Sequence, residues 1–412
     1  MIVDPAPRLV AWESTRACNL ACVHCRAEAQ ERSLPGELST EEAFRLVDQI
    51  AEFAEPIFII SGGEPLYRAD IFEVASYATK KGFRAVLSTN GTLLTPEIIE
   101  KMHQAGIRRI SVSLDGSSPG RNDSFRMVPG AFEGAARGLA FARDGNMPFQ
   151  INTTVTRRNL DDLPDMLRTV IDLGAVTWDV FMLVPTGRGK IEDEVNPEEY
   201  EQVLNWIAGV SQTSPIPVKV TCGPHYQRIT REKADQSRRT PGGVTDPAAN
   251  GSPGEGQRIV VPTSRRGEET TTGQRYSTSS SLASIRPAGH PGNTVLAGGL
   301  RAGHPGGHTS RGCMAGNGFV FVSYKGEVFP CGYFPVMAGD VRREHFREIY
   351  QASPLFVQLR DLNQLQGKCG RCEYRAVCGG CRARALGKTG DYLAEEPYCV
   401  YQPRLGAAVG QA

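Results

Sequence analysis

Several features that mark particular classes of protein are missing from this 412-residue sequence. Charge of one sign is not in excess: 46 Lys and Arg stand against 45 Asp and Glu, so no overall field favours nucleic acid or an anionic membrane as the main partner. No run of about eighteen apolar residues predicts a membrane span. Residues 1–15 lack a basic stretch followed by a long apolar run, so no secretory signal is expected and we predict a cytoplasmic protein.

Cysteine, by contrast, is plentiful, with eleven residues in the chain. The cytosol keeps thiols reduced, so disulfides are not expected there, and clustered cysteines in such a protein usually bind metal. The hydrophobic fraction of 40% is ordinary for a chain that buries a core, and the length suffices for one large domain and a smaller one. We therefore expect a globular protein with metal sites.

The first half of the chain alternates short apolar runs rich in β-formers with longer stretches of helical apolar spacing. Such a βα repeat predicts an α/β fold with a parallel sheet wrapped by helices, and six units predict an incomplete barrel whose open side admits a large substrate. The six candidate strands are residues 8–15, 57–62, 85–90, 109–116, 149–156 and 178–186.

The composition changes near residue 228. Residues 228–311 are rich in Gly, Pro, Ser, Thr and Arg without apolar periodicity, so we predict a low-complexity, disordered insertion. Order is expected to return at 318–330, two strand-like runs around a turn at Lys325-Gly326. The predicted organisation is a core at 1–227, the insertion at 228–311 and a cysteine-rich domain at 312–412.

The first cysteine cluster directly follows the first predicted strand. Cys18, Cys22 and Cys25 are separated by three and then two residues. Three thiolates on one loop can hold three irons of a 4Fe-4S cubane and leave the fourth iron open to another ligand. The alternative is a three-cysteine zinc site, which would need a close fourth ligand.

This spacing, with His24 just before the last cysteine, resembles the signature of the radical S-adenosylmethionine (SAM) superfamily. That resemblance implies a partial (β/α)6 barrel, a catalytic cluster on the three cysteines and SAM as cofactor. The superfamily also carries a segment after the second strand that binds the SAM amino group, matched here by Gly62, Gly63, Glu64 and Pro65. Glycines let the backbone approach a ligand closely, and Glu64 can accept from an ammonium group.

Later strands would supply the ribose and adenine contacts of SAM. By the same resemblance Ser113 and Asp115 look like partners of the ribose hydroxyls, with Asn152, Thr89 and Asn90 as weaker candidates. Ser113 could equally fill the barrel. Arg126 would face SAM or the substrate, or form a surface ion pair.

Seven further cysteines follow residue 311. Their pattern resembles the SPASM extension of radical SAM enzymes, a small α+β domain that houses auxiliary 4Fe-4S clusters. It departs at Gly379-Gly380, where the gap before Cys381 is two residues instead of three, so one or two auxiliary clusters remain possible. Cys222 could complete the nearer cluster or be a structural thiol, and zinc is the competing ligand for two CxxC pairs. The resemblance implies a distal cluster on Cys369, Cys372, Cys378 and Cys399, and a nearer one on Cys313, Cys331 and Cys381.

The segments 7–29 and 378–399 look most like the haem-biosynthesis branch of these enzymes, whose iron-coproporphyrin decarboxylase is the nearest type. This implies an oxidoreductase acting on the side chains of an iron-tetrapyrrole, with flavodoxin or ferredoxin as electron donor. His225, Tyr226, Arg382 and Arg384 would contact the substrate, or else pack within the protein. Two alternatives stay open: a maturase that modifies a ribosomal peptide, and an iron-sulfur redox protein without catalysis.

Overall fold

The computed structural model describes residues 5–239 and 312–404. Most of the predicted insertion, residues 240–311, lies outside the described residues. One ten-stranded sheet organises the described chain, in the order β10-β9-β8-β1-β2-β3-β4-β5-β6-β7. The strands are β1 (Leu9–Glu13), β2 (Ile57–Ser61), β3 (Arg84–Thr89), β4 (Ile110–Ser113), β5 (Phe149–Val155), β6 (Thr177–Met182), β7 (Val218–Thr221), β8 (Phe319–Val322), β9 (Glu327–Phe329) and β10 (Gly339–Asp340).

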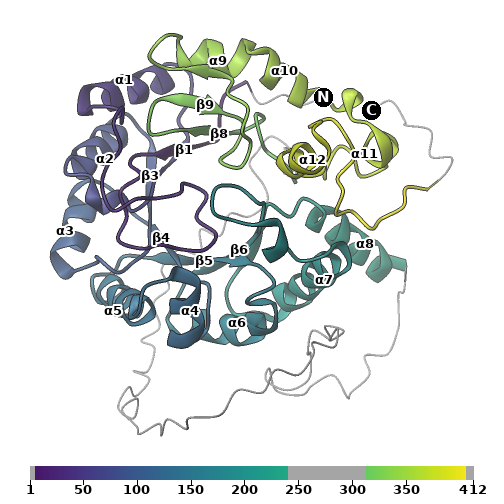
Figure 1. Cartoon of the computed structure of the whole chain (residues 1–412), viewed down its shortest axis with the longest axis horizontal. Coiled ribbons are helices and arrows are strands. Elements are labelled where there is room, and N and C mark those ends of the chain that lie inside the picture. The colour runs from purple at the N-terminus through teal and green to yellow at the C-terminus, as the bar shows by residue number, and fades with distance from the viewer. Residues whose placement is uncertain (1–4, 240–311, 405–412) are drawn as a thin grey trace, which may run out of the picture. The chain divides into compact units, whose positions relative to one another are not determined.

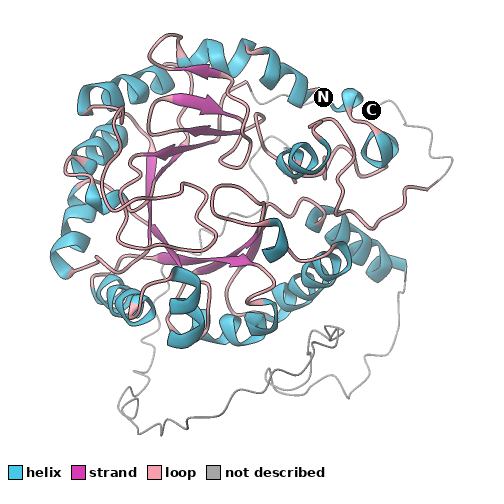
Figure 2. Cartoon of the chain, in the orientation of Figure 1, coloured by secondary structure: helices cyan, strands magenta, loops and turns pink. Residues whose placement is uncertain are grey.

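Strands β1 to β7 are parallel and follow one another in chain order. All six predicted strands are present, and the expected α/β fold is confirmed. Figure 2 shows these strands curving around a central space with helices on the outside. β7, which sequence reasoning did not include, adds a seventh parallel strand beside β6.

The helices between the strands bury one face against the sheet. In α1, for example, Ala43, Leu46, Val47 and Ile50 are buried, and Ser39 caps the helix start by accepting from the backbone N–H of Glu42. The α-helices are α1 (Thr40–Ala51), α2 (Ile71–Lys80), α3 (Pro96–Gln104), α4 (Pro119–Arg126), α5 (Ala131–Asp144), α6 (Leu163–Asp172), α7 (Pro197–Thr213), α8 (Tyr226–Arg239), α9 (Phe346–Ala352), α10 (Pro354–Arg360), α11 (Gly367–Arg371) and α12 (Arg382–Thr389). Short 3-10 helices are η1 (Pro65–Tyr67), η2 (Leu160–Asp162), η3 (Ile191–Asp193) and η5 (Leu362–Gln364).

The C-terminal part extends the same sheet. β8 pairs in parallel with β1, and β9 turns back along β8 as the predicted hairpin around Lys325-Gly326. Gly326 has a φ of 90°, a left-handed conformation that suits glycine at a tight turn. The cysteine-rich segment with α11 and α12 follows, and Figure 1 shows it between β8 and α8, on the open side of the barrel.

The predicted start of the insertion at residue 228 differs from the structure, because α8 continues to Arg239. This helix is mostly polar and gave no apolar periodicity in the sequence. It is held by specific contacts to α7: Ile229 is buried, and Arg228 donates to both oxygens of Glu201 at 2.6 Å. The ordered core therefore extends at least twelve residues beyond the predicted boundary. Among the described helices, none is long and apolar enough to cross a membrane.

Candidate functional site

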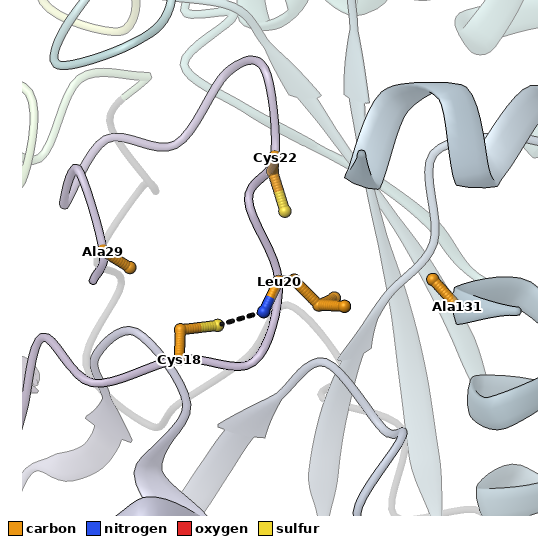
Figure 3. Packing of buried hydrophobic residues seen from close by; sticks show 5 residues of the cluster. All are labelled: Cys18, Leu20, Cys22, Ala29 and Ala131. Atoms are coloured by element: carbon orange, nitrogen blue, oxygen red, sulfur yellow. Dashed lines mark hydrogen bonds between the residues drawn. The ribbon is translucent and has the colours of Figure 1, made fainter. Parts of the chain in front are cut away.

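The loop that carries Cys18, Cys22 and Cys25 is fixed at several points. The backbone N–H of Cys18 donates to Gln30 O at 2.7 Å, and that of Ala21 donates to Arg126 O at 3.2 Å. Farther along the chain, Arg188 donates through Nε to Cys22 O at 3.0 Å. Figure 3 shows Cys18 and Cys22 on this loop, opposite Ala131 at the start of α5. A loop at the carboxyl end of β1 is thereby held in one conformation.

Each of the three thiols receives an N–H group. The backbone N–H of Leu20 lies 3.4 Å from Cys18 Sγ, that of Ala29 lies 3.4 Å from Cys25 Sγ, and Arg126 Nη1 lies 3.5 Å from Cys22 Sγ. Burial raises the pKa of Cys18 to about 11. Such a thiol becomes a thiolate when a cation binds it, and N–H donors stabilise that charge. These donors suit an anionic iron-sulfur cluster.

Gly62 and Gly63 pack directly against this cysteine loop. Glu64 N donates to Ala17 O at 2.7 Å. A Cβ on Gly62 would lie 2.5 Å from Thr15 O, and one on Gly63 would lie 2.4 Å from Ala17 O. The glycines thus permit close approach of two chain segments, whereas the sequence suggested approach to a ligand. Pro65 then opens η1.

The Glu64 carboxylate is satisfied within the protein. It is fully buried and accepts from Thr89 Oγ1 at 2.9 Å and from Asn90 N at 2.7 Å. Burial raises its pKa to about 7, against the effect of these hydrogen bonds. This carboxylate therefore anchors the end of β3 to the Gly-Gly segment, and Thr89 and Asn90 act as its partners.

Asp115 joins a buried cluster beside the cysteine loop. It forms an ion pair with Arg126 and lies 3.7 Å from His24 Nε2, while its Oδ1 accepts from Thr154 N at 2.7 Å. Burial lowers the pKa of His24 to about 4, and its ring packs 4.6 Å from that of Phe125. These contacts position Arg126 so that its guanidinium reaches the thiol of Cys22. The sequence predicts Arg126 as a contact to SAM or the substrate or as a surface ion pair, whereas the structure buries it in an ion pair with Asp115.

Ser113, the last residue of β4, is the register partner of Asn152, which lies in the middle of β5. Both side chains are partly exposed, and Asn152 Oδ1 accepts from Gln150 Nε2 at 2.9 Å. Ser113 ends its strand on the same side of the sheet as the cysteine loop, which follows the carboxyl end of β1. Of the two predicted ribose partners, Ser113 keeps the more accessible polar group and Asp115 is used internally, while Asn152, a weaker candidate, is also accessible.

Four C-terminal cysteines share one cavity, which is the set that the resemblance assigned to a distal cluster. Gly380 lines this cavity, and a Cβ on it would lie 3.3 Å from Cys369 Sγ. Arg382 Nη2 approaches the same sulfur at 3.7 Å, and Glu396 N approaches it at 3.3 Å. The lining includes Cys369, Cys372, Cys378, Cys399, Gly379, Gly380 and His225.

A second cysteine group forms where β7 ends. Cys222 packs with Cys331 against the cluster that contains Cys381. Burial raises the pKa of Cys222 strongly, and the charges of Cys381, Cys331 and Cys313 raise it further. Cys222 also adopts a φ of 59°, a left-handed conformation that is uncommon outside glycine. The structure thus brings Cys222 to the three cysteines of the predicted nearer site.

Arg382 and Arg384 belong to the interior, which favours the packing alternative for both. Arg382 donates to Tyr392 O at 3.0 Å and Ala394 O at 2.8 Å. Arg384 pairs with Glu194 at 3.0 Å. Tyr226, the third suggested substrate contact, bonds through its hydroxyl to Ser211 at 3.1 Å.

Both kinds of site fit the clusters that the sequence implied. Three cysteines with N–H donors stand on one fixed loop, and four others line a single cavity together with an imidazole that has no partner in the described chain. Within residues 5–239 and 312–404, no three His, Cys, Asp or Glu side chains converge as ligands of one metal ion. The ligands of a cubane bind different irons, which sets them farther apart than ligands of a single ion.

Comparisons with known proteins agree with this geometry. The Radical SAM superfamily matches residues 12–170, and an iron-sulfur cluster-binding domain, SPASM, matches residues 313–381. The AdoMet-dependent heme synthase of Methanosarcina barkeri is 46% identical over 97% of each chain. That of Nitratidesulfovibrio vulgaris is 42% identical over 97% of this chain and 94% of the other. The structure of Streptococcus suis SuiB bound to S-adenosylmethionine matches 96% of this chain and 78% of its own, with a TM-score of 0.65 and 14% identity, which shows a shared fold.

Proposed function

Because the chain belongs to the radical SAM superfamily, and within it to the family of AdoMet-dependent heme synthases, we propose that it makes haem by oxidative decarboxylation of an iron-coproporphyrin. The observation that carries this proposal is the 46% identity to the Methanosarcina barkeri protein, which spans 97% of both chains and so includes both cysteine-rich regions. The same comparisons favour this substrate class over a ribosomal peptide and over a redox protein without catalysis.

In this reaction the propionate carbon next to the ring would lose a hydrogen atom to a deoxyadenosyl radical derived from SAM. The carboxylate would then leave as carbon dioxide, a vinyl group would form, and one electron would remain for each propionate. When bound, the catalytic cluster would supply the electron that cleaves SAM, and an auxiliary cluster would accept the electron left by decarboxylation.

For the catalytic site, we propose that Cys18, Cys22 and Cys25 hold the cluster. Three observations support this: their common loop, their N–H donors and the match of residues 12–170. The segment of Gly62, Gly63, Glu64 and Pro65 packs against the cysteine loop and holds it in place. We propose that backbone groups of this segment bind the SAM amino group. Ser113, at the end of β4, and its register partner Asn152 in β5 are the proposed SAM contacts. His24 and Asp115 keep Arg126 directed toward Cys22.

For the auxiliary sites, we propose Cys369, Cys372, Cys378 and Cys399 as ligands of the distal cluster. The shared cavity supports this set. For the nearer cluster we propose Cys313, Cys331 and Cys381 with Cys222 as the fourth ligand, supported by the packing of Cys222 with Cys331 and Cys381. The gap before Cys381 has two residues where the SPASM pattern has three. Gly379 and Gly380, both at positive φ, let the backbone make this shorter connection.

The catalytic loop and the nearer cysteine group lie next to each other. Arg26, which follows Cys25, approaches Gly332, which follows Cys331: a Cβ on that glycine would lie 3.2 Å from Arg26 Cδ. Arg26 also pairs with the buried carboxylate of Glu13 at 3.0 Å, and its guanidinium lies 4.4 Å from the ring of Phe321. A substrate bound beside the catalytic loop would therefore be close to an electron acceptor, which oxidative decarboxylation requires.

The remaining partners follow from this chemistry. An external reductant such as flavodoxin or ferredoxin would supply electrons for SAM cleavage. We also propose a cytoplasmic location, because all eleven cysteines are free and cluster ligands must stay reduced.

The test uses anaerobically reconstituted protein with reductant and SAM. Iron-coproporphyrin, metal-free coproporphyrin and no substrate are compared for deoxyadenosine and for porphyrin mass. The proposal predicts conversion of the iron form to vinyl products. Deoxyadenosine without any change in the porphyrin would overturn the substrate, and absence of deoxyadenosine from iron-replete protein would overturn catalysis.

A further inference from the structure

A short loop outside the SPASM match reaches both auxiliary sites. It consists of residues 222–225, between β7 and α8, and it is separated in sequence from the matched residues 313–381. Cys222 packs in the nearer cysteine group, and His225 lines the distal cavity. A Cβ on Gly312 would meet Pro224 O and Cys378 O, each at 2.9 Å, so this loop lies against the cysteine-rich segment.

The imidazole of His225 forms no hydrogen bond within the described residues. Its side chain is fully buried, and neither ring nitrogen has a hydrogen-bond partner in residues 5–239 and 312–404. The ring packs edge-on against Tyr200, with centroids 5.1 Å apart. Leaving a buried donor unpaired costs about 1–3 kcal/mol, so a partner for the imidazole is expected in the cavity that it lines.

The surroundings of His225 suit an anionic partner. Besides burial, the largest electrostatic effects on its pKa come from the cations Arg384, Arg228, Lys368 and Arg382, and the cavity lining also includes Glu396. A 4Fe-4S cluster with four thiolate ligands carries negative charge, and its sulfurs accept hydrogen bonds. Cys369, Cys372, Cys378 and Cys399 already provide one ligand for each of four irons. The imidazole is therefore not needed as a ligand, and its N–H remains available.

We propose that His225 donates a ring N–H hydrogen bond to a sulfur of the distal cluster and thereby raises the reduction potential of that cluster. A donor stabilises the more negative, reduced state more than the oxidised state. The loop 222–225 would then serve both auxiliary sites, with a ligand for one and a hydrogen-bond donor for the other. The inference rests on the proposed distal ligand set and does not depend on the porphyrin substrate.

The test is a potentiometric titration of the full-length holoprotein, followed by electron paramagnetic resonance, in the absence of SAM and porphyrin. His225→Leu removes the donor, His225→Gln keeps one, and Tyr226→Phe is the matched control, since its hydroxyl bonds to Ser211 away from the distal cavity. Iron content is measured for every variant. Because neither SAM nor substrate is present, the outcome is independent of the haem assignment.

For His225→Leu the inference predicts that one cluster becomes harder to reduce by about tenfold in its equilibrium constant, which corresponds to about 59 mV for a one-electron couple. His225→Gln should recover much of that shift, and Tyr226→Phe should leave every midpoint unchanged. Equal midpoints in His225→Leu and the wild type at full iron content would overturn the inference. So would loss of about four irons from both His225 variants, which would make His225 a ligand or a structural support.

Discussion

Replacing Arg384 by Met tests how much the buried ion pairs of this residue stabilise the packing of the cysteine-rich segment on the barrel. Arg384, on α12, is fully buried, pairs with Glu194 of the barrel at 3.0 Å and donates to Leu183 O at 2.9 Å. It also lies 3.7 Å from Glu396, whose side chain is fully buried. Removing one member of a buried ion pair leaves a carboxylate in the interior and costs about 3–5 kcal/mol.

The entropy of unfolding is about 2 cal/mol/K per residue, so for the roughly 330 described residues each kcal/mol shifts the thermal midpoint by about 1.5 °C, and Arg384→Met should lower it by about 4–7 °C. The assay is anaerobic thermal unfolding of reconstituted protein. Arg343→Met is the matched control: that side chain is 84% exposed, its pair with Asp340 spans 3.8 Å, and its loss should cost at most about 1 kcal/mol. Adding Glu396→Gln to Arg384→Met should recover part of the loss, because it removes the buried carboxylate that Arg384 had faced, whereas Glu194 keeps Lys388 at 3.0 Å. If Arg384→Met has the same thermal midpoint as the Arg343→Met control, the buried pair does not stabilise the packing of the cysteine-rich segment on the barrel.

Three further predictions concern the sites. Cys222→Ala should lower the iron content by up to about four per chain or change the spectrum of one cluster, while SAM-dependent signals persist; unchanged iron and spectra would exclude Cys222 as a ligand. Gly63→Ala should sharply reduce deoxyadenosine formation, because its Cβ would lie 2.4 Å from Ala17 O, whereas Gly120→Ala, with open space around it, should not; equal rates would contradict the packing argument. Burial raises the pKa of Glu64 from 4.5 to about 7, so the folded chain holds a proton that the unfolded chain releases, and stability is lost as pH rises through this window. In denaturant unfolding of cluster-free protein, Glu64→Gln should therefore lose less stability than the wild type between about pH 5 and about pH 8. An equal loss in both proteins would contradict the raised pKa of Glu64.

The strands were predictable because each is a short apolar run that ends in a polar turn. The runs that contain Trp12, Phe58 and Ile151 alternate with amphipathic helices, and this local pattern determines a parallel sheet. The end of the core was harder to predict. α8 has few apolar residues, and its stability comes from Arg228 and Ile229 packing on α7, a tertiary contact that local spacing does not reveal.

The proposed catalytic ligands could be grouped from the sequence because they lie close together in it. Cys18, Cys22 and Cys25 share one loop, so spacing sufficed. Cys222 reaches its group only through the fold, because β7 brings it beside cysteines about ninety residues or more away. The internal role of Glu64 was also hidden, since its donors come from the end of a different strand.

Haem formation by this protein can be tested by counting deoxyadenosine and carbon dioxide during turnover of iron-coproporphyrin by the anaerobically reconstituted protein. We expect one deoxyadenosine for each carbon dioxide released, haem as the final porphyrin, and no turnover after Cys18, Cys22 and Cys25 are all replaced by Ala. Deoxyadenosine formed without carbon dioxide, or carbon dioxide released by the triple variant, would contradict it.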